Sequence, residues 1–83
     1  MYYVYVLQSL KDRDLYIGIT SDLETRIRRH NAGYEKSTKR RIPFVLLYSE
    51  VFATRLEARD REKYFKSGFG REIIRSLLIK AKE

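Results

Sequence analysis

The chain has 83 residues, 43% of them hydrophobic, which allows one small domain over residues 1–83 and no second core. It contains no cysteine, which excludes a disulfide framework and a thiolate metal cage, and no apolar run approaches membrane-spanning length, so we expect a soluble cytoplasmic protein. The formal net charge of +7 favours a polyanionic partner such as nucleic acid over a membrane surface.

Two strands are expected first, over residues 2–8 and 15–19, where β-branched and aromatic residues predominate. The short polar stretch between them predicts an antiparallel pair. Gly18 lies inside the second strand. It indicates either that a ligand or another chain segment approaches the backbone closely there, or that the glycine relieves crowding.

A helix is predicted directly after the second strand. Ser21 as the N-cap and Glu24 three residues later have the spacing of a capping box. We expect this helix to run to about Asn31, with Gly33 supplying its end.

This helix presents two different faces. Leu23 and Ile27 are spaced to face the core, whereas Arg26 and His30 share another face at i,i+4. Taken alone, a histidine near the C-terminus of a helix is more simply a favourable partner of the helix dipole than a site residue.

The excess positive charge is concentrated between Arg26 and Arg41, where seven basic residues stand against the single acid Glu35. We expect contacts with backbone phosphates, which give affinity rather than sequence choice. The alternative is a solvated face that only aids solubility. The residues predicted to bind DNA are Arg29, Lys36, Lys39, Arg40 and Arg41.

A third strand is predicted over residues 44–51, and its continuous apolar start indicates a central position in the sheet, covered on both faces. Thr54 and Glu57 form a second capping box, which opens a helix to about Ser67. The element order is ββαβαα, so the predicted fold is of the α+β class, with one three-stranded antiparallel sheet flanked by helices.

The last helix is expected over about residues 71–82, after a break at Gly68 and Gly70. Its apolar residues recur with the period of a helix and predict a stripe that packs on the core. The stripe consists of Ile73, Ile74, Leu77, Leu78 and Ala81.

Glu62 is the unusual residue of the preceding helix. Its spacing puts it near Ala58 and Phe65, on what should be the inward side, where a carboxylate is costly to bury unless a cation or a metal pairs with it. An ion pair with an arginine and a metal site are both open from spacing alone. The candidate arginines are Arg26, Arg59 and Arg61.

Together these motifs resemble the GIY-YIG nuclease superfamily, most closely its small stand-alone members. The same module begins the incision subunit of nucleotide-excision repair and the phage-type homing endonucleases. The resemblance covers roughly residues 2–67 and depends on four motifs in order and spacing. They are Tyr3-Val4-Tyr5, Tyr16-Ile17-Gly18, the segment from Asp22 to His30, and Glu57-Ala58 with Arg61-Glu62.

The chain departs from the superfamily pattern at two places. The first tripeptide is Tyr-Val-Tyr rather than Gly-Ile-Tyr, which keeps the tyrosine at Tyr5. Many members also carry an asparagine downstream of the glutamate, whereas no asparagine follows Glu62 and the nearest small polar residue is Ser67.

The resemblance implies a set of site residues drawn from both strands and both helices. They are the tyrosines Tyr5 and Tyr16, the catalytic arginine Arg26, the helix histidine His30, the glycine Gly18 of the second tripeptide, and Glu62 as the ligand of one divalent metal ion, Mg²⁺ or Mn²⁺. For either tyrosine alone, packing in a small core is the simpler interpretation.

The chemistry of phosphodiester hydrolysis agrees with these roles. The fork of Arg26 matches phosphate oxygens, and Glu62 offers the oxygen ligand that Mg²⁺ prefers. We expect Arg26, nearby lysines and the metal to make the phenolate of Tyr5 more accessible, so that it deprotonates a water.

We therefore expect a metal-dependent DNA endonuclease that prefers a DNA structure, such as a branched or damaged one, and serves repair or recombination. The sequence does not distinguish DNA from RNA. One alternative is a nucleic-acid-binding module that cleaves slowly or not at all. Another is a subunit of a larger complex, although the chain itself is expected to be a monomer or a weak homodimer.

Overall fold

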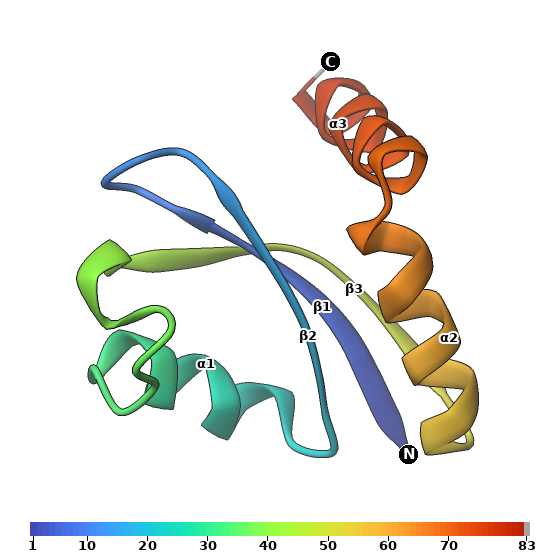
Figure 1. Cartoon of the computed structure of the whole chain (residues 1–83), viewed down its shortest axis with the longest axis horizontal. Helices are drawn as coiled ribbons and strands as arrows, with labels where there is room; N and C mark the ends of the chain where they lie inside the picture. The colour runs from blue at the N-terminus through green and yellow to red at the C-terminus, as the bar shows by residue number, and fades with distance from the viewer. Residues whose placement is uncertain (83) are drawn as a thin grey trace.

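The computed structural model describes the backbone of residues 1–82 and the side chains of residues 1–76 (Figure 1). Its elements follow the predicted order ββαβαα, and the predicted α+β class with a three-stranded antiparallel sheet is confirmed. The elements are β1 (Tyr2–Ser9), β2 (Leu15–Thr20), α1 (Leu23–Asn31), a short 3₁₀ helix (Lys39–Arg41), β3 (Phe44–Phe52), α2 (Arg55–Lys66) and α3 (Gly68–Lys82). Within residues 1–82, no helix combines the length and the apolar character that crossing a membrane requires.

The central strand is β1, because the sheet order is β2-β1-β3 and both neighbours pair with β1 in antiparallel fashion. The four residues from Val4 to Leu7 are all buried. The prediction that the strand after Pro43 is central is therefore wrong, since β3 lies at an edge and its Val45 and Leu46 are exposed. An apolar run shows that side chains can be buried, but helices cover the β3 side of this sheet only in part.

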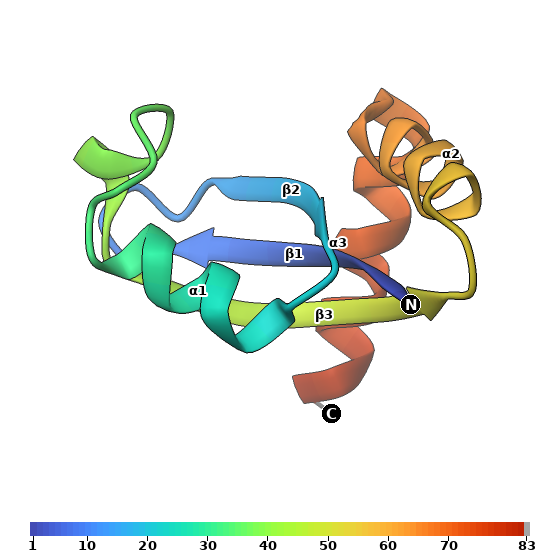
Figure 2. The same cartoon turned by 90° about the horizontal axis from the view of Figure 1, so that it is seen from below.

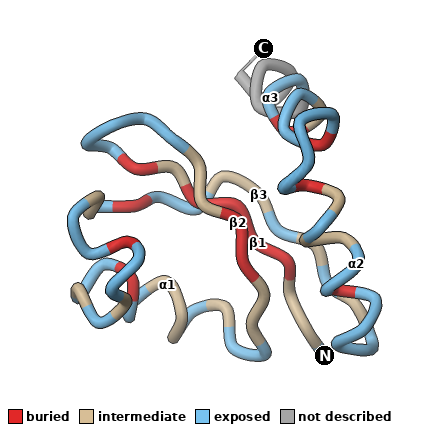
Figure 3. The backbone as a smooth tube through the Cα atoms, viewed as in Figure 1, coloured by how far each residue is buried: buried red, intermediate tan, exposed pale blue. Residues whose placement is uncertain are grey.

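Successive residues of β1 enter two different cores, one on each face of the sheet. The α2-side core consists of Val4, Val6, Ile17, Ala58, Phe65 and Ile74. The α1-side core consists of Tyr5, Leu7 and Phe44, with Tyr16, Leu23, Ile27 and Ile42 packed against it. The helix α1 accordingly lies on one side of the sheet and α2 on the other, with the buried part of β1 between them (Figures 2 and 3).

The helix α1 begins one residue later than predicted, because its N-cap is Asp22 and not Ser21. The Asp22 carboxylate accepts the main-chain N–H of Thr25 at 3.2 Å and the Thr25 hydroxyl at 2.8 Å. A carboxylate here makes both bonds and places negative charge at the positive end of the helix dipole. The second predicted cap is confirmed, since Thr54 accepts the N–H of Glu57 at 3.3 Å.

The helices α2 and α3 are separated by one residue, Ser67, whose backbone is extended. Its hydroxyl oxygen accepts the N–H of Gly70 at 3.1 Å and so caps α3. The prediction that Gly68 and Gly70 both lie in a break before residue 71 is wrong, because α3 already begins at Gly68. Gly70 lies in the first turn of α3, where a Cβ would collide with the carbonyl of Tyr64.

The apolar stripe predicted for the last helix is described in part. Ile74 is fully buried in the α2-side core, and Ile73 is half-buried. The side chains of Leu77, Leu78 and Ala81 lie outside the described residues.

Candidate active site

A polar hollow of about 330 Å³ opens at the β2 edge of the sheet, where residues of α1 and α2 approach it from opposite faces. It gathers residues from four elements. The side chains predicted from the sequence that line it are Tyr5, Tyr16, Arg26 and Glu62, together with the backbone of Gly18. The other lining residues are Ile19, Arg55 and Arg59.

Gly18 lies directly opposite Tyr5 in the β1–β2 register. A Cβ on Gly18 would stand 2.6 Å from the Tyr5 hydroxyl oxygen and 3.2 Å from the Tyr16 ring. The segment that approaches this glycine is therefore a side chain of the same site. Gly18 allows the Tyr5 ring to lie flat across β2 with its hydroxyl at the hollow.

His30 lies beneath the hollow and is fully buried. Its Nε2 is 3.0 Å from the Tyr5 hydroxyl, and its Nδ1 is 2.9 Å from the hydroxyl of Thr38. The Tyr16 ring meets the imidazole edge-on, with 4.9 Å between the ring centres. Both ring nitrogens of His30 thus have partners, and neighbouring aromatic rings fix the plane of the imidazole.

Burial dominates the protonation of this pair. It raises the pKa of Tyr5 from 10.0 to about 12, although the Arg26 guanidinium beside the phenol acts in the opposite direction. Arg26 favours the phenolate of Tyr5, as predicted, but burial outweighs it and the pKa is raised overall. Burial also lowers the pKa of His30, and the positive charge of Arg26 lowers it further, so the imidazole is held neutral.

Arg26 extends from α1 toward the Tyr5 hydroxyl, and this contact raises the pKa of the guanidinium. Its Nη1 lies 3.2 Å from a carboxylate oxygen of Glu35, which also binds Arg29 at 3.2 Å. The Nε–H of Arg26 is buried and has no hydrogen-bond partner among the described residues. The Arg26 side chain as a whole is 35% exposed and lines the hollow, so the accessible part of its guanidinium can bind an anion such as a phosphate oxygen there.

Glu62 faces the same hollow from α2, with its side chain 18% exposed. Its predicted arginine partners do not bind it. One carboxylate oxygen instead pairs with Lys66 at 3.3 Å, while Arg61 pairs with Glu50 at 2.8 Å.

The surroundings of Glu62 fit one type of metal site. In the described part of the chain, no three His, Cys, Asp or Glu side chains gather into a metal-binding group. Mg²⁺ commonly takes one or two carboxylates and completes its shell with water and substrate phosphates. Glu62, with one oxygen free of Lys66 and a cationic hollow suited to phosphate beside it, fits such a site.

Arg55 and Arg59 are site residues that the sequence reasoning missed. They line the hollow from α2, and no ion pair within the described residues engages either of them. The signal was present in the spacing, because residues 55, 59 and 62 follow the i, i+4, i+7 pattern of one helix face. Arg55 also lines an adjoining hollow of about 270 Å³ that shares Arg26.

The predicted DNA-binding residues fall into two groups. Lys36, Lys39 and Arg40 are exposed on the loop between α1 and β3. Arg29 and Arg41 have partners within the chain. Arg29 binds Glu35 and lies over the Tyr34 ring, and Arg41 binds Asp12 at 3.0 Å and lies over the Phe44 ring.

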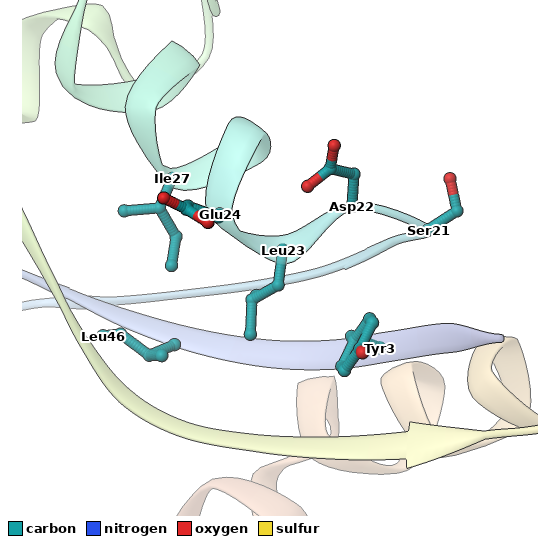
Figure 4. A pocket seen from close by; sticks show the side chains of 7 residues that line it. All are labelled: Tyr3, Ser21, Asp22, Leu23, Glu24, Ile27 and Leu46. Carbon is teal, nitrogen blue, oxygen red and sulfur yellow. The ribbon is translucent and has the colours of Figure 1, made fainter.

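A separate hollow, of about 470 Å³, lies between the start of α1 and the sheet (Figure 4). Tyr3, Leu23, Ile27 and Leu46 give it apolar walls, and the carboxylates of Asp22 and Glu24 stand at its rim. Although this hollow is the larger of the two, it has no cationic side chain in its lining. The smaller hollow is therefore the candidate active site.

Residues 1–73 match the family described as the GIY-YIG catalytic domain, and the chain belongs to this nuclease family. The UPF0213 protein SH2523 of Staphylococcus haemolyticus is 46% identical over 67 residues, which cover 80% of this chain and 80% of that protein. The UPF0213 protein CPE1444 of Clostridium perfringens is 48% identical over 67 residues, or 80% of this chain and 71% of that protein.

The fold is also similar to that of a solved structure from the same group of proteins. The solution NMR structure of the UPF0213 protein BH0048 from Bacillus halodurans matches with a TM-score of 0.56 and 37% sequence identity, covering 93% of this chain and 85% of that chain. The predicted resemblance to small stand-alone GIY-YIG proteins is confirmed.

Proposed function

We propose that this chain is a metal-dependent endonuclease that hydrolyses phosphodiester bonds in DNA, with residues 1–83 acting as one nuclease domain. The convergence of two phenols, a guanidinium and a carboxylate on one hollow carries the proposal. Phosphodiester hydrolysis needs a base for the attacking water, positive charge for the phosphate oxygens and an oxygen ligand for a metal ion. The hollow offers a residue for each of these needs.

Tyr5 is the proposed base, with His30 behind it as the final proton acceptor. As the attacking water gives a proton to the Tyr5 oxygen, the hydroxyl proton of Tyr5 passes to Nε2 of His30 across 3.0 Å, and the imidazolium later returns that proton to solvent. The water oxygen attacks phosphorus, the ester bond breaks, and the leaving oxygen takes a proton from solvent. Tyr5 is among the residues that line the hollow, so the attacking water is proposed to approach it from that side.

This arrangement reconciles a raised phenol pKa with a role as base. An isolated phenol with a pKa of about 12 is almost never ionised at neutral pH. A neutral imidazole in contact with it accepts the proton during the reaction, so no free phenolate has to accumulate beforehand. Tyr16 forms the wall of the hollow and holds the imidazole plane from its edge.

Arg26 is the proposed ligand of the phosphate that reacts, through the exposed part of its guanidinium that lines the hollow. Arg55 and Arg59 hold the same phosphate or its neighbour from α2. Glu62 is proposed to hold one Mg²⁺ or Mn²⁺ ion, which when bound supplies further positive charge to the phosphate oxygens.

We further propose that the substrate is selected by DNA geometry, such as a branch or a damaged site, in repair or recombination. The exposed residues Lys36, Lys39 and Arg40 contact backbone phosphates outside the hollow. Phosphate contacts carry affinity and orientation, whereas sequence is read through base edges.

The test is cleavage of labelled branched, flapped, single-stranded and duplex DNA, and of matching RNA, with Mg²⁺ or Mn²⁺. Tyr5→Phe, Arg26→Ala and Glu62→Gln should each slow cleavage by about 10²-fold or more, as expected for groups that act in the transition state. All three proteins should retain the circular dichroism spectrum of the wild type.

Two variants serve as matched controls. Arg28→Ala removes an arginine of α1 whose side chain is 70% exposed and pairs with Glu24, and Glu72→Gln changes an exposed carboxylate of α3. Both should cleave like the wild type. If Arg26→Ala and Glu62→Gln cleave as fast as these controls, the activity belongs to a contaminant. Salt-sensitive DNA binding without cleavage of any substrate would favour a binding module.

A further inference from the structure

Thr38 lies in the basic loop between α1 and β3, yet its side chain is fully buried. The loop folds back beneath α1 so that the Thr38 hydroxyl meets Nδ1 of His30 at 2.9 Å. Two side-chain bonds from Asn31 to the main chain of Phe44, at 2.7 and 3.1 Å, fix the start of the strand that follows this loop. The contact between Thr38 and His30 is therefore a built part of the fold.

The hydrogen-bond partners of Thr38 favour one direction for its bond to His30. A hydroxyl has one proton to donate, and a carbonyl oxygen can only accept. The Thr38 hydroxyl also reaches the carbonyl oxygen of Glu35 at 3.4 Å, and that oxygen accepts the main-chain N–H of Thr38 and Lys39 as well. This carbonyl offers the hydroxyl proton an acceptor, which leaves the Thr38 oxygen able to accept a proton from Nδ1 of His30.

The other side of the imidazole is compatible with the same direction. The Tyr5 hydroxyl oxygen faces the guanidinium of Arg26, which has protons to donate and no lone pair to accept one. The phenol proton can then point to Nε2 of His30, an arrangement that suits a ring with its proton on Nδ1 but does not by itself require it. If the imidazole carried its proton on Nε2, that proton would point at the hydroxyl proton of Tyr5. The Thr38 hydroxyl would then have to donate to Nδ1 instead of accepting from it.

We infer that Thr38 is a positioning residue that holds His30 in the tautomer with its proton on Nδ1, so that Nε2 is free to take the proton of Tyr5. The bond made by one ring nitrogen decides which tautomer the other presents. The assignment of the tautomer stands on the contacts of His30 alone. Its consequence for cleavage rests on the function proposed above.

The same turn also orients the second active side chain. The carbonyl of Glu35 holds Thr38, while the carboxylate of Glu35 holds Arg26 at 3.2 Å. One local turn of the basic loop therefore sets both the proton acceptor and the phosphate ligand. A change in this turn should disturb the chemistry without removing a group that touches substrate.

The tautomer can be measured directly, because His30 is the chain's one histidine. The ¹⁵N shifts and long-range proton couplings of its ring distinguish a proton on Nδ1 from a proton on Nε2. Wild type and Thr38→Ser should carry the proton on Nδ1. Thr38→Val keeps the shape of the side chain but removes the acceptor, and it should shift the ring toward Nε2–H.

A proton on Nε2 in the wild type would overturn the inference. This measurement uses the wild-type protein alone, so it does not depend on whether a variant folds. Retention of the Nδ1 proton in folded Thr38→Val would overturn it equally. Neither measurement depends on nuclease activity. If the wild type has the Nδ1 proton but cleaves no substrate, the proposed function fails and the tautomer assignment stands.

Cleavage kinetics test the consequence. Thr38→Val should lower kcat by about 10- to 100-fold with little change in KM, as is typical when a group that orients a site ligand is lost. Thr38→Ser should restore most of the rate, and Ser37→Ala, at the exposed neighbouring position, should leave it unchanged. Equal losses in Thr38→Ser and Thr38→Val would mean that Thr38 acts only through packing.

Discussion

The two faces of β1 are built from alternate residues of one strand, yet they bury different kinds of side chain. On the α2 side, Val4 and Val6 enter a core that contains only apolar residues. On the α1 side, Tyr5 lies against His30, which in turn contacts Thr38, and both of these polar side chains are fully buried. One strand therefore carries the apolar support of the fold and the polar centre of the site, one residue apart.

The difference has a physical basis. Fully burying an aliphatic or aromatic side chain contributes about 1.5–3 kcal/mol, whereas a buried hydrogen bond contributes only about 0.5–1.5 kcal/mol net. A site that needs fixed phenol and imidazole groups gains less stability for each side chain that it buries. The apolar α2 side then supplies much of the stability that keeps the α1 side in register.

The largest effect on this contrast should come from Phe65→Ala on the α2 side. Phe65 is fully buried, and removal of such a ring typically costs about 3–5 kcal/mol. The free energy of unfolding, from urea titration followed by circular dichroism, should fall by that amount. Cleavage per folded molecule should stay near that of the wild type.

Phe69→Ala is the matched control, because Phe69 lies four residues later and is 68% exposed. Its change in free energy should lie within about 0.5 kcal/mol. If Phe65→Ala were no more damaging than Phe69→Ala, the α2-side core would not be the main support of the fold.

Gly18→Ala should produce the second largest effect and the opposite pattern. The added Cβ overlaps the Tyr5 hydroxyl, so Tyr5 has to move away from His30. Overpacking of this kind costs about 1–3 kcal/mol, while displacement of a reacting group by about 1 Å can slow a reaction by about 10²-fold. Cleavage should thus fall far more than stability does.

The control for this change is Gly68→Ala, where a Cβ meets nothing within 4 Å. That protein should keep both its stability and its cleavage rate. Wild-type cleavage by folded Gly18→Ala would show that the position of the Tyr5 hydroxyl does not matter.

Local patterns predicted most of the elements because their causes are local. The run of β-branched and aromatic residues in β1, the cap at Thr54 and the glycine after α1 each act within a few residues, and the structure has all three. The choice between Ser21 and Asp22 as cap was missed because both residue types suit the position, and only the bonds to Thr25 decide it.

Features that depend on distant residues were not readable from the sequence. The edge position of β3 depends on which strand pairs with β1 on its other side, which the apolar run at Phe44 does not encode. The complete burial of His30 depends on Thr38 returning beneath α1 from eight residues away. The partner of Glu62 was missed for a different reason. Lys66 is its local i,i+4 neighbour, but the prediction considered only arginines as partners of the carboxylate.

A change of pH tests the α1 side without a mutation. The folded protein lowers the pKa of His30 below its ordinary value of 6.5, chiefly through burial, so it binds this proton less well than the unfolded chain does. The free energy of unfolding should therefore be unaffected by His30 above pH 6.5 and should fall as the pH drops below that value, until it passes the folded pKa.

Urea titrations at constant ionic strength between about pH 7 and pH 5 would measure this slope. This pH range lies above the ordinary pKa values of carboxyl groups, so these groups contribute little to it. His30→Gln cannot titrate there and should have a flat profile. The same slope in both proteins would mean that the buried imidazole is not its source.

The smallest effect should come from Lys66→Gln at the outer edge of the site. Lys66 binds Glu62 across one helical turn at 3.3 Å and so competes with a metal ion for the carboxylate. Exposed i,i+4 pairs contribute about 0.3–0.5 kcal/mol, so losing this pair should lower the Mg²⁺ concentration for half-saturation by only about two-fold.

Lys63→Gln is the control for this change. It removes the same charge from an exposed position of α2 and so separates the loss of the ion pair from the change in net charge. Calorimetric titration with Mg²⁺ measures both proteins without any substrate. Tighter binding in Lys66→Gln but not in Lys63→Gln would assign the metal to Glu62, whereas equal shifts in both would make the effect one of overall charge and leave Glu62 without a metal.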